Sequence, residues 1–252
     1  MIKLFLMALL RRRIGSFGLL MLMLDRIGVP IERYTVRGQG GVRLEVRGGS
    51  SDRYTVFETL VRGDYITQCN LRSGDTVVDI GANIGVFSVL AARRVGPAGR
   101  VIAIEPNPET ADQLERNVRL NGLSNVHVWR AAVTGRAGTM DLHLGNAALF
   151  ASLLPSVDNH STGGRTVPVT CFALHHIIAS EAIERVNLLK IDCEGGEYEI
   201  FDTADDELWS RLQTIVMETH RIMGRNPAEL KSRLQSQGYR TSGTDLLYAS
   251  RA

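Results

Sequence analysis

The sequence predicts a single α/β domain, built on a mostly parallel β-sheet with helices on both faces and preceded by a short N-terminal extension. Short β-branched apolar runs at residues 76–80 and 100–104 are typical of parallel strands buried on both faces. Strand and helix patterns alternate from residue 76 to residue 130, which favours parallel pairing with right-handed crossovers. A length of 252 residues suits one such domain with additions.

We assign the extension to residues 1–54 and the domain to residues 55–252. Residues 1–27 carry two apolar pieces separated by three arginines, and they predict one or two helices that pack on the body, on a second subunit or at a membrane surface. Neither piece is long enough to span a bilayer, and no signal-peptide cleavage site follows. Residues 28–54 predict a short hairpin.

Within the domain, residues 56–71 show a helical pattern ahead of the first core strand. Further along we predict helices at 86–94 and 108–120, the second with Asn107 as its N-cap. We predict strands at 126–130, 187–191 and 213–218, and a closing hairpin over 238–249. An insertion at about 134–171 interrupts this order, with strands at 138–144 and 166–171. We expect the polar loop between those two strands to cover an active site.

The composition narrows the function and the compartment. A net charge of +2 indicates no nucleic-acid partner. Three cysteines without metal-ligand spacing favour a reducing cytoplasm over a disulfide framework. Lysine occurs only three times among 29 basic residues, which is typical of a GC-rich bacterial genome.

The turn after the first core strand reads D-x-G-x-N-x-G, from Asp79 through Gly81 and Asn83 to Gly85. A dinucleotide site uses G-x-G-x-x-G to hold a pyrophosphate, so the spacing and the leading acid disfavour that ligand. Asp79 could instead accept from the amino group of an amino-acid-bearing nucleoside, a description that S-adenosylmethionine fits. Glu105 closes the second strand twenty residues after Gly85, where a carboxylate can bind both ribose hydroxyls. The plain alternative is a strand-to-helix turn with incidental glycines.

Polar side chains gather where the core strands end, at the edge of the sheet where α/β proteins bind ligands. They are Asp79, Glu105, Arg130, Asp192, Glu194, Glu197, Glu218 and His220. Asp192, Glu218 and His220 have two alternative roles. One of them removes the proton of an acceptor hydroxyl as general base, or all three hold a divalent cation, Mg²⁺, that orients and acidifies it. The ordinary alternative is that these groups cap helices or pair with arginines. In the insertion, His143 is a candidate for contact with the substrate.

Three segments in order, residues 78–88, 103–108 and 189–197, resemble the FkbM family of S-adenosylmethionine-dependent methyltransferases. The resemblance covers roughly residues 55–220. It implies a Rossmann-like class I methyltransferase fold, a seven-stranded sheet with a reversed last strand. It also implies O-methylation of a hydroxyl on a sugar, an oligosaccharide or a glycosylated natural product. Cys193 departs from the aliphatic or threonine residue usual in the family.

Several site residues follow from the resemblance. Those implied to bind the cofactor are Glu58, Asp79, Gly81, Asn83 and Gly85 around the methionine moiety, Glu105 at the ribose with Pro106 beside it, Ala131 and Ala132 on the adenine side, and Asp192. Asp192 and Glu194 would also border the acceptor. The candidate catalytic residues are thus Asp192, Glu194, Glu218, His220 and His143.

The acceptor is expected to be a carbohydrate or another small molecule. The arginine-rich, actinobacterial type of composition points to methylated mannose or glucose polysaccharides. Rival functions are an N-methyltransferase, a nicotinamide oxidoreductase and a non-catalytic cofactor-binding module. The apolar N-terminus favours a homodimer, with peripheral membrane contact as an alternative.

Overall fold

The computed structural model of the chain describes residues 14–63, 65, 69–144, 151–152, 165–193, 195–222 and 224–251. A seven-stranded sheet in the order β12-β13-β11-β10-β3-β4-β5 forms its centre. The strands are β3 (Thr76–Ile80), β4 (Arg100–Ile104), β5 (Val126–Trp129), β10 (Val186–Ile191), β11 (Leu212–Glu218), β12 (Arg240–Ser242) and β13 (Leu246–Ser250).

One strand of this sheet runs against the others. The pairs of β10 with β11, β10 with β3, β3 with β4 and β4 with β5 are parallel. The pairs of β13 with β11 and with β12 are antiparallel. The last strand is therefore the reversed one, and the predicted seven-stranded class I methyltransferase sheet is confirmed.

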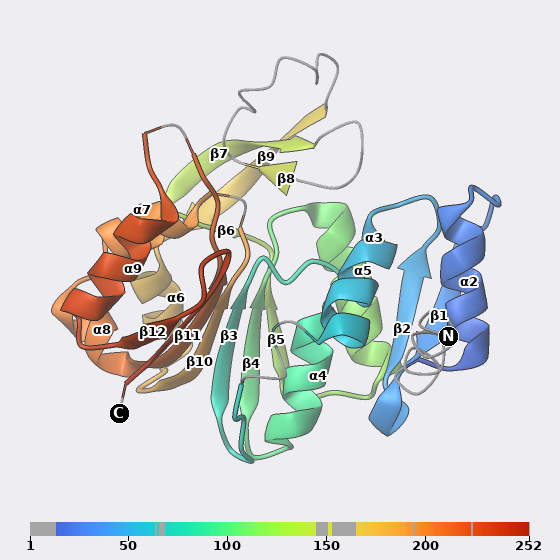
Figure 1. The fold of residues 1–252 in the computed structure, drawn as a ribbon, viewed down its shortest axis with the longest axis horizontal. Coiled ribbons are helices and arrows are strands. Elements are labelled where there is room, and N and C mark those ends of the chain that lie inside the picture. The colour runs from blue at the N-terminus through green and yellow to red at the C-terminus, as the bar shows by residue number, and fades with distance from the viewer. Residues whose placement is uncertain are drawn as a thin grey trace.

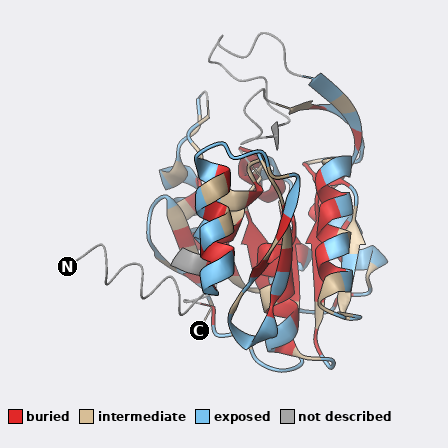
Figure 2. Cartoon of the chain, turned by 90° about the vertical axis from the view of Figure 1, so that its right-hand side faces the viewer, coloured by how far each residue is buried: buried red, intermediate tan, exposed pale blue. Residues whose placement is uncertain are grey.

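Helices cover both faces of the sheet (Figure 1). On one face lie α4 (Val86–Val95) and α5 (Pro108–Leu120), and on the other α6 (Leu174–Ser180), α7 (Glu197–Asp202), α8 (Asp206–Arg211) and α9 (Pro227–Ser236). Val77 packs against α4 while its neighbour Val78 packs toward α6. Because successive strand residues point to opposite, equally buried faces, the strands read as continuous apolar runs. Figure 2 shows the buried strands between exposed outer helix faces.

The start of α5 follows the sequence signal closely. The Asn107 side chain accepts a hydrogen bond from the Glu109 N–H at 3.1 Å, and Pro108 occupies the first helical position. An N-cap oxygen and a proline both serve the unpaired first turn of a helix. This fixes the direction in which the chain leaves β4, and so the position of Glu105 just before it.

The N-terminal extension forms its own layer. It contains α2 (Ser16–Arg26) and a two-stranded antiparallel sheet of β1 (Arg33–Arg37) and β2 (Arg43–Arg47), joined by the short turn η1 (Gln39–Gly41). Next along the chain, across the boundary expected at residue 54, come α3 (Asp52–Thr55) and η2 (Val56–Arg62). Its apolar residues share one core with the start of α4. The helix expected over residues 56–71 is shorter: it ends at Arg62 as a π-helix, because Gly63 takes a left-handed conformation at φ 75°.

Only one face of α2 is buried. Leu19 and Leu22 pack inward, whereas Phe17 is 66 % exposed and Ile27 75 %. Five of the eight exposed large apolar side chains in the described part of the chain fall between residues 17 and 29. Residues 1–13 lie outside the described residues. No helix among the described residues is both long enough and apolar enough to cross a membrane.

The insertion builds a separate four-stranded sheet in the order β6-β9-β7-β8. Its strands are β6 (Ala132–Val133), β7 (Gly138–Leu144), β8 (Ala151–Ser152) and β9 (Arg165–Phe172). In Figure 1 this sheet stands above the upper ends of β3, β4 and β10. The polar loop expected to cover the site lies outside the described residues.

Candidate active site

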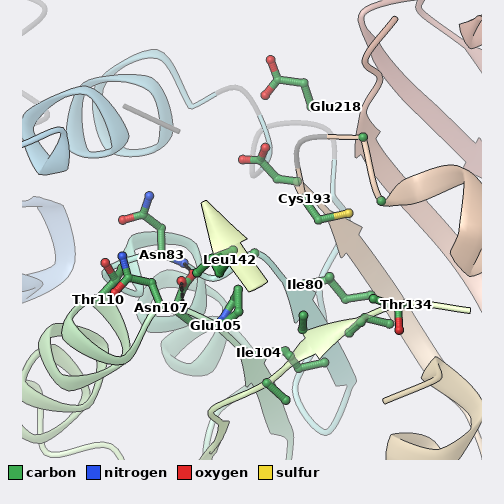
Figure 3. A pocket seen from close by; sticks show the side chains of 18 of the residues that line it. Ile80, Asn83, Ile104, Glu105, Asn107, Thr110, Thr134, Leu142, Cys193 and Glu218 are labelled. Atoms are coloured by element: carbon green, nitrogen blue, oxygen red, sulfur yellow. Dashed lines mark hydrogen bonds between the residues drawn. The ribbon is translucent and has the colours of Figure 1, made fainter. Parts of the chain in front are cut away.

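A cavity of about 620 Å³ opens at the carboxyl ends of β3, β4, β10 and β11 (Figure 3). Its volume suits a small-molecule ligand, and the edge is where open α/β sheets bind ligands. The walls also include one face of α3 and η2, with Tyr54, Thr55 and Glu58, and two residues of β7, Met140 and Leu142. The cavity therefore joins the extension, the central sheet and the insertion.

Glu105 lies at one end of this cavity, held by the backbone around it. Its Oε2 accepts from the Asn83 N–H and its Oε1 from the Asn107 N–H, both at 2.9 Å. Burial raises the pKa of Glu105 to about 7, although these two hydrogen bonds act in the opposite direction. Each carboxylate oxygen can accept a further hydrogen bond, so the pair can receive two vicinal hydroxyls.

The turn beside Glu105 depends on a close backbone approach. At Gly81, φ is 70° and a Cβ would lie 1.7 Å from the carbonyl oxygen of Asp192. Only glycine fits there. Asn83 is also left-handed, at φ 50°. The end of β10 is thereby seated directly against the turn that follows β3.

Asp79 lies in the interior of the sheet, where it is paired with a lysine. The side chain is fully buried and does not reach the cavity wall; its carboxylate contacts Lys190 Nζ at 3.1 Å and accepts from Ser88 Oγ at 2.5 Å. In a parallel strand buried on both faces, the phase of residue 79 directs it to the interior, where a buried carboxylate needs a partner. In this structure Asp79 forms a buried ion pair with Lys190, and its expected contact with a ligand's amino group stays a prediction.

Most of the other predicted cofactor residues lie on the wall, namely Glu58, Gly81, Asn83, Glu105, Pro106, Ala131, Ala132 and Asp192. Gly85 does not: it is the left-handed N-cap of α4, and a Cβ there would lie 3.0 Å from Leu114 Cγ. Gly85 therefore allows the turn to lead into α4 and to pack against α5, without lining the cavity. Glu194 lies outside the described residues.

His143 also lies off the wall. Met140 and Leu142 line the cavity, and successive side chains of a strand point to opposite sides. The side of β7 that faces the cavity is therefore that of residues 140 and 142, and the candidate His143 lies on the other side. His143 pairs in register with Thr166 of β9 and Ser152 of β8.

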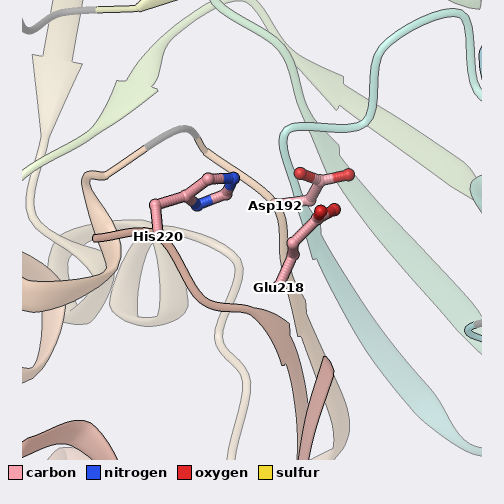
Figure 4. A group of neighbouring side chains, drawn as sticks. All are labelled: Asp192, Glu218 and His220. Carbon is pink, nitrogen blue, oxygen red and sulfur yellow. The ribbon is translucent and has the colours of Figure 1, made fainter. Parts of the chain in front are cut away.

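At the other end of the cavity, Asp192, Glu218 and His220 come together (Figure 4). Their ligand atoms all lie within 4.8 Å of one another. Asp192 follows β10 and Glu218 ends β11, two paired parallel strands, so the two carboxylates emerge side by side. Two unit charges about 4 Å apart repel by about 4 kcal/mol at an effective dielectric constant of 20. The site therefore needs groups that offset this repulsion.

Two residues that sequence reasoning did not assign to the site, Tyr65 and Lys190, contact these carboxylates, and Glu197, which it had placed at this edge, contacts His220. Tyr65 Oη lies 2.9 Å from Glu218 Oε2 and 3.1 Å from Asp192 Oδ2. Lys190 Nζ lies 3.7 Å from Asp192 Oδ2. The fully buried Glu197 accepts from the His220 N–H at 2.8 Å and contacts its Nδ1 at 3.1 Å.

Of the residues not assigned from the sequence, Lys190 carried a usable signal there. A lysine inside the apolar run that forms β10 requires a buried counter-charge, and Asp79 is its register partner on β3. Burial alone would lower the pKa of Lys190, but the neighbouring Asp79 and Asp192 carboxylates outweigh it and raise that pKa. Tyr65 gave no such signal, because a tyrosine in a polar stretch is common.

The donor set at this end fits a divalent cation in part. Carboxylate oxygens suit Mg²⁺, while an imidazole nitrogen is more typical of zinc or iron sites. Glu197 holds one ring nitrogen of His220, as outer partners of metal-binding histidines do. The same three side chains also form a set of proton acceptors around one point.

The fold and this two-ended cavity define a class I S-adenosylmethionine-dependent methyltransferase. The Methyltransferase FkbM domain model matches residues 79–241. Methyltransferase sdnD of Sordaria araneosa is 30% identical over 68% of this chain and 75% of its own length. The 31-O-demethyl-FK506 methyltransferase FkbM of Streptomyces tacrolimicus is 28% identical over 61% of this chain and 68% of its own.

The crystal structure of Methyltransferase FkbM from Methylobacillus flagellatus superposes with a TM-score of 0.53 at 16% identity, covering 97% of this chain and 57% of that chain. At this identity the likeness shows the fold alone. With the domain match spanning well over half of the sequence, the chain belongs to the FkbM methyltransferase family.

Proposed function

We propose that the chain methylates a hydroxyl oxygen of a sugar, an oligosaccharide or a glycosylated natural product. The observation that carries this is the pairing, in one cavity, of a ribose-type carboxylate at Glu105 with a proton-accepting cluster around Asp192. When bound, S-adenosylmethionine supplies a methyl group already activated as a sulfonium. The protein then has to position the acceptor oxygen and take its proton.

The cofactor end is assigned to residues of the wall. Glu105 would bind the ribose hydroxyls, with Asn83 and Pro106 beside it. Glu58 and Gly81 would hold the methionine moiety, and Ala131 and Ala132 would flank the base. The supporting observation is that all of these line the cavity.

At the acceptor end, the attacking hydroxyl would form its new bond to the methyl carbon while the carbon–sulfur bond breaks. The hydroxyl proton passes to Asp192, Glu218 or His220 as general base. Lys190 Nζ stands 3.7 Å from Asp192 Oδ2 and can hold that carboxylate in place, which supports Asp192 as the residue that receives the acceptor's proton.

A divalent cation at the same three residues is a second way to deprotonate that hydroxyl. The support is the mutual 4.8 Å spacing of the ligand atoms and the contact of Glu197 with His220. Mg²⁺ there would orient and acidify the oxygen. Chelation separates this route from the metal-free one.

An uncharged hydroxylated acceptor suits the mixed wall, which carries Tyr54, Met140 and Leu142 beside the acids. The name of the Streptomyces tacrolimicus relative states O-methylation of a natural product, FK506. The decisive experiment is a panel of oligosaccharide acceptors, including mannose and glucose oligomers, with radiolabelled cofactor. Label recovered on nitrogen, or no turnover on any hydroxylated acceptor, would reject the proposal.

We also propose that the chain forms a homodimer through the exposed face of α2. That face bears Phe17, Leu20, Met23 and Ile27, and the single acid of the helix, Asp25, is buried and bonded to Tyr34 Oη at 2.9 Å. An apolar face without acidic side chains can pair with its own copy across a two-fold axis. The free thiols of the three cysteines support a cytoplasmic location.

A further inference from the structure

Tyr65 stands behind the acceptor end of the cavity and joins the ends of two strands. Its side chain is 6 % exposed and is not part of the cavity wall. The hydroxyl lies 2.9 Å from Glu218 Oε2 and 3.1 Å from Asp192 Oδ2, each within hydrogen-bond distance. One phenol therefore spans the two carboxylates that the proposed reaction uses.

The ring of Tyr65 is fixed from its sides. Phe87 of α4 packs against it edge-on, with ring centroids 6.2 Å apart. Lys190 Nζ lies 5.3 Å from the ring centroid, over the face of the ring. The backbone carbonyl of Tyr65 accepts from Cys69 Sγ at 2.8 Å. These contacts tie the hydroxyl to the packing between α4 and the central sheet.

The phenol acts as a donor rather than as a base. Carboxylate oxygens accept hydrogen bonds, so the phenol oxygen within reach of Glu218 Oε2 and Asp192 Oδ2 bonds to them through its own proton. A phenol has one proton to donate, and two carboxylates compete for it. At any moment one of the two acids therefore has capacity for another donor, and an acceptor hydroxyl is such a donor.

We propose that Tyr65 is a positioning residue for methyl transfer, whose hydroxyl holds Asp192 and Glu218 side by side so that an acceptor hydroxyl can be seated and deprotonated between them. This rests on the proposed function and extends it to a residue that never touches the acceptor. Without the hydroxyl, the two carboxylates repel and turn apart.

The test compares Tyr65→Phe with the wild-type full-length enzyme. We expect kcat to fall about tenfold and the acceptor KM to rise about tenfold, because both the seat and the proton acceptor are displaced. The dissociation constant and stoichiometry of S-adenosylmethionine binding should stay within twofold. A folding defect alone would lower the stoichiometry and leave KM unchanged.

A matched control is Tyr34→Phe, which removes another buried tyrosine hydroxyl bonded to a carboxylate, Asp25, at 2.9 Å. It lies in the extension, and we expect kcat and KM within twofold of wild type. A double-mutant cycle then tests whether Tyr65 acts through the acid: in a Glu218→Gln background, Tyr65→Phe should cost less than threefold.

Provided that the wild-type enzyme methylates a hydroxyl, two results would overturn the positioning role of Tyr65. One is Tyr65→Phe kinetics within twofold of wild type, and the other is a Tyr65→Phe loss of full size in the Glu218→Gln background. If the wild-type enzyme transfers no methyl group to any hydroxylated acceptor, the proposed function is rejected, and the positioning role of Tyr65 is rejected with it.

Discussion

Asp79 and Lys190 form an ion pair inside the sheet, in register on the adjacent parallel strands β3 and β10, with Lys190 Nζ 3.1 Å from Asp79 Oδ1. The ammonium also donates to the carbonyl oxygen of Gly81 at 2.8 Å and lies 3.7 Å from Asp192. One buried cation thus contacts the sheet interior, the turn at Gly81 and the Asp192 carboxylate.

Replacing Lys190 by Met should destabilise the fold by about 3–5 kcal/mol, because it leaves the Asp79 carboxylate buried without its counter-charge. Urea unfolding followed by circular dichroism measures the change. The double variant Lys190→Met with Asp79→Leu should recover most of the loss, since an apolar pair leaves no uncompensated charge. Equal losses in the single and the double variant would contradict this account.

Cofactor affinity should depend on pH through Glu105. Its pKa of about 7 is raised by burial, and ribose hydroxyls bond better to the ionised form. The dissociation constant of S-adenosylmethionine should therefore rise about tenfold per unit as the pH falls below 7, and level off above it. Calorimetry from pH 5.5 to 8.5 tests this. Glu105→Gln should bind weakly and without this slope, whereas the α5 variant Glu115→Gln should keep it.

Asp192→Ala should lower kcat at least a hundredfold, as expected for loss of a general base or of a metal ligand. S-adenosylmethionine affinity should stay within a few-fold, which equilibrium binding can measure. Asp112→Ala, which removes an exposed acid paired with Arg130, serves as the control and should leave both quantities unchanged. Loss of cofactor binding in Asp192→Ala would reverse the roles assigned to the two ends of the cavity.

Chelation distinguishes the two routes to deprotonation. If Asp192, Glu218 and His220 hold a cation, dialysis against EDTA should abolish transfer, and added Mg²⁺ or Mn²⁺ should restore it. Manganese binding followed by electron paramagnetic resonance should then weaken in Glu218→Gln. Full activity in EDTA would leave the metal-free route.

Leu20→Glu together with Ile27→Glu should convert the proposed dimer to a monomer, because the charges would be buried in the apolar contact between two α2 helices. Sedimentation velocity reports the mass. Ser232→Glu, which adds the same charge to the exposed surface of α9, should remain dimeric. A wild-type monomer at all concentrations would reject the dimer, and binding of that monomer to anionic vesicles would assign the face to a membrane.

The strands of the central sheet could be predicted because burial on two faces leaves a simple mark in the sequence. The N-cap at Asn107 could be predicted because its signal is local. The partner of Asp79 could not, since Lys190 lies more than a hundred residues away and only the register of β3 with β10 brings them together. Which side of β7 faces the cavity could not be predicted for a similar reason: alternation shows two faces, and only the packed insertion shows that Leu142 lines the cavity.

The cavity thus contained most of the residues that the motifs indicated, while one group that holds them in place left no signal in the sequence. Tyr65 is the clearest case. Its proposed role depends on contacts of its hydroxyl with Glu218 and Asp192, at 2.9 and 3.1 Å. These residues are far from Tyr65 in the sequence, so no motif spacing predicts the contacts.

The insertion sheet has its own hydrogen-bonded order, β6-β9-β7-β8, yet it contributes Met140 and Leu142 to the cavity. These two β7 side chains can therefore be exchanged without altering the register of β3 with β4, on which Glu105 depends. Under the proposed function, acceptor choice and cofactor retention become separable traits. A library confined to the outward and cavity-facing positions of β7 could redirect this methyltransferase to new alcohols while every member still recognises the same methyl donor.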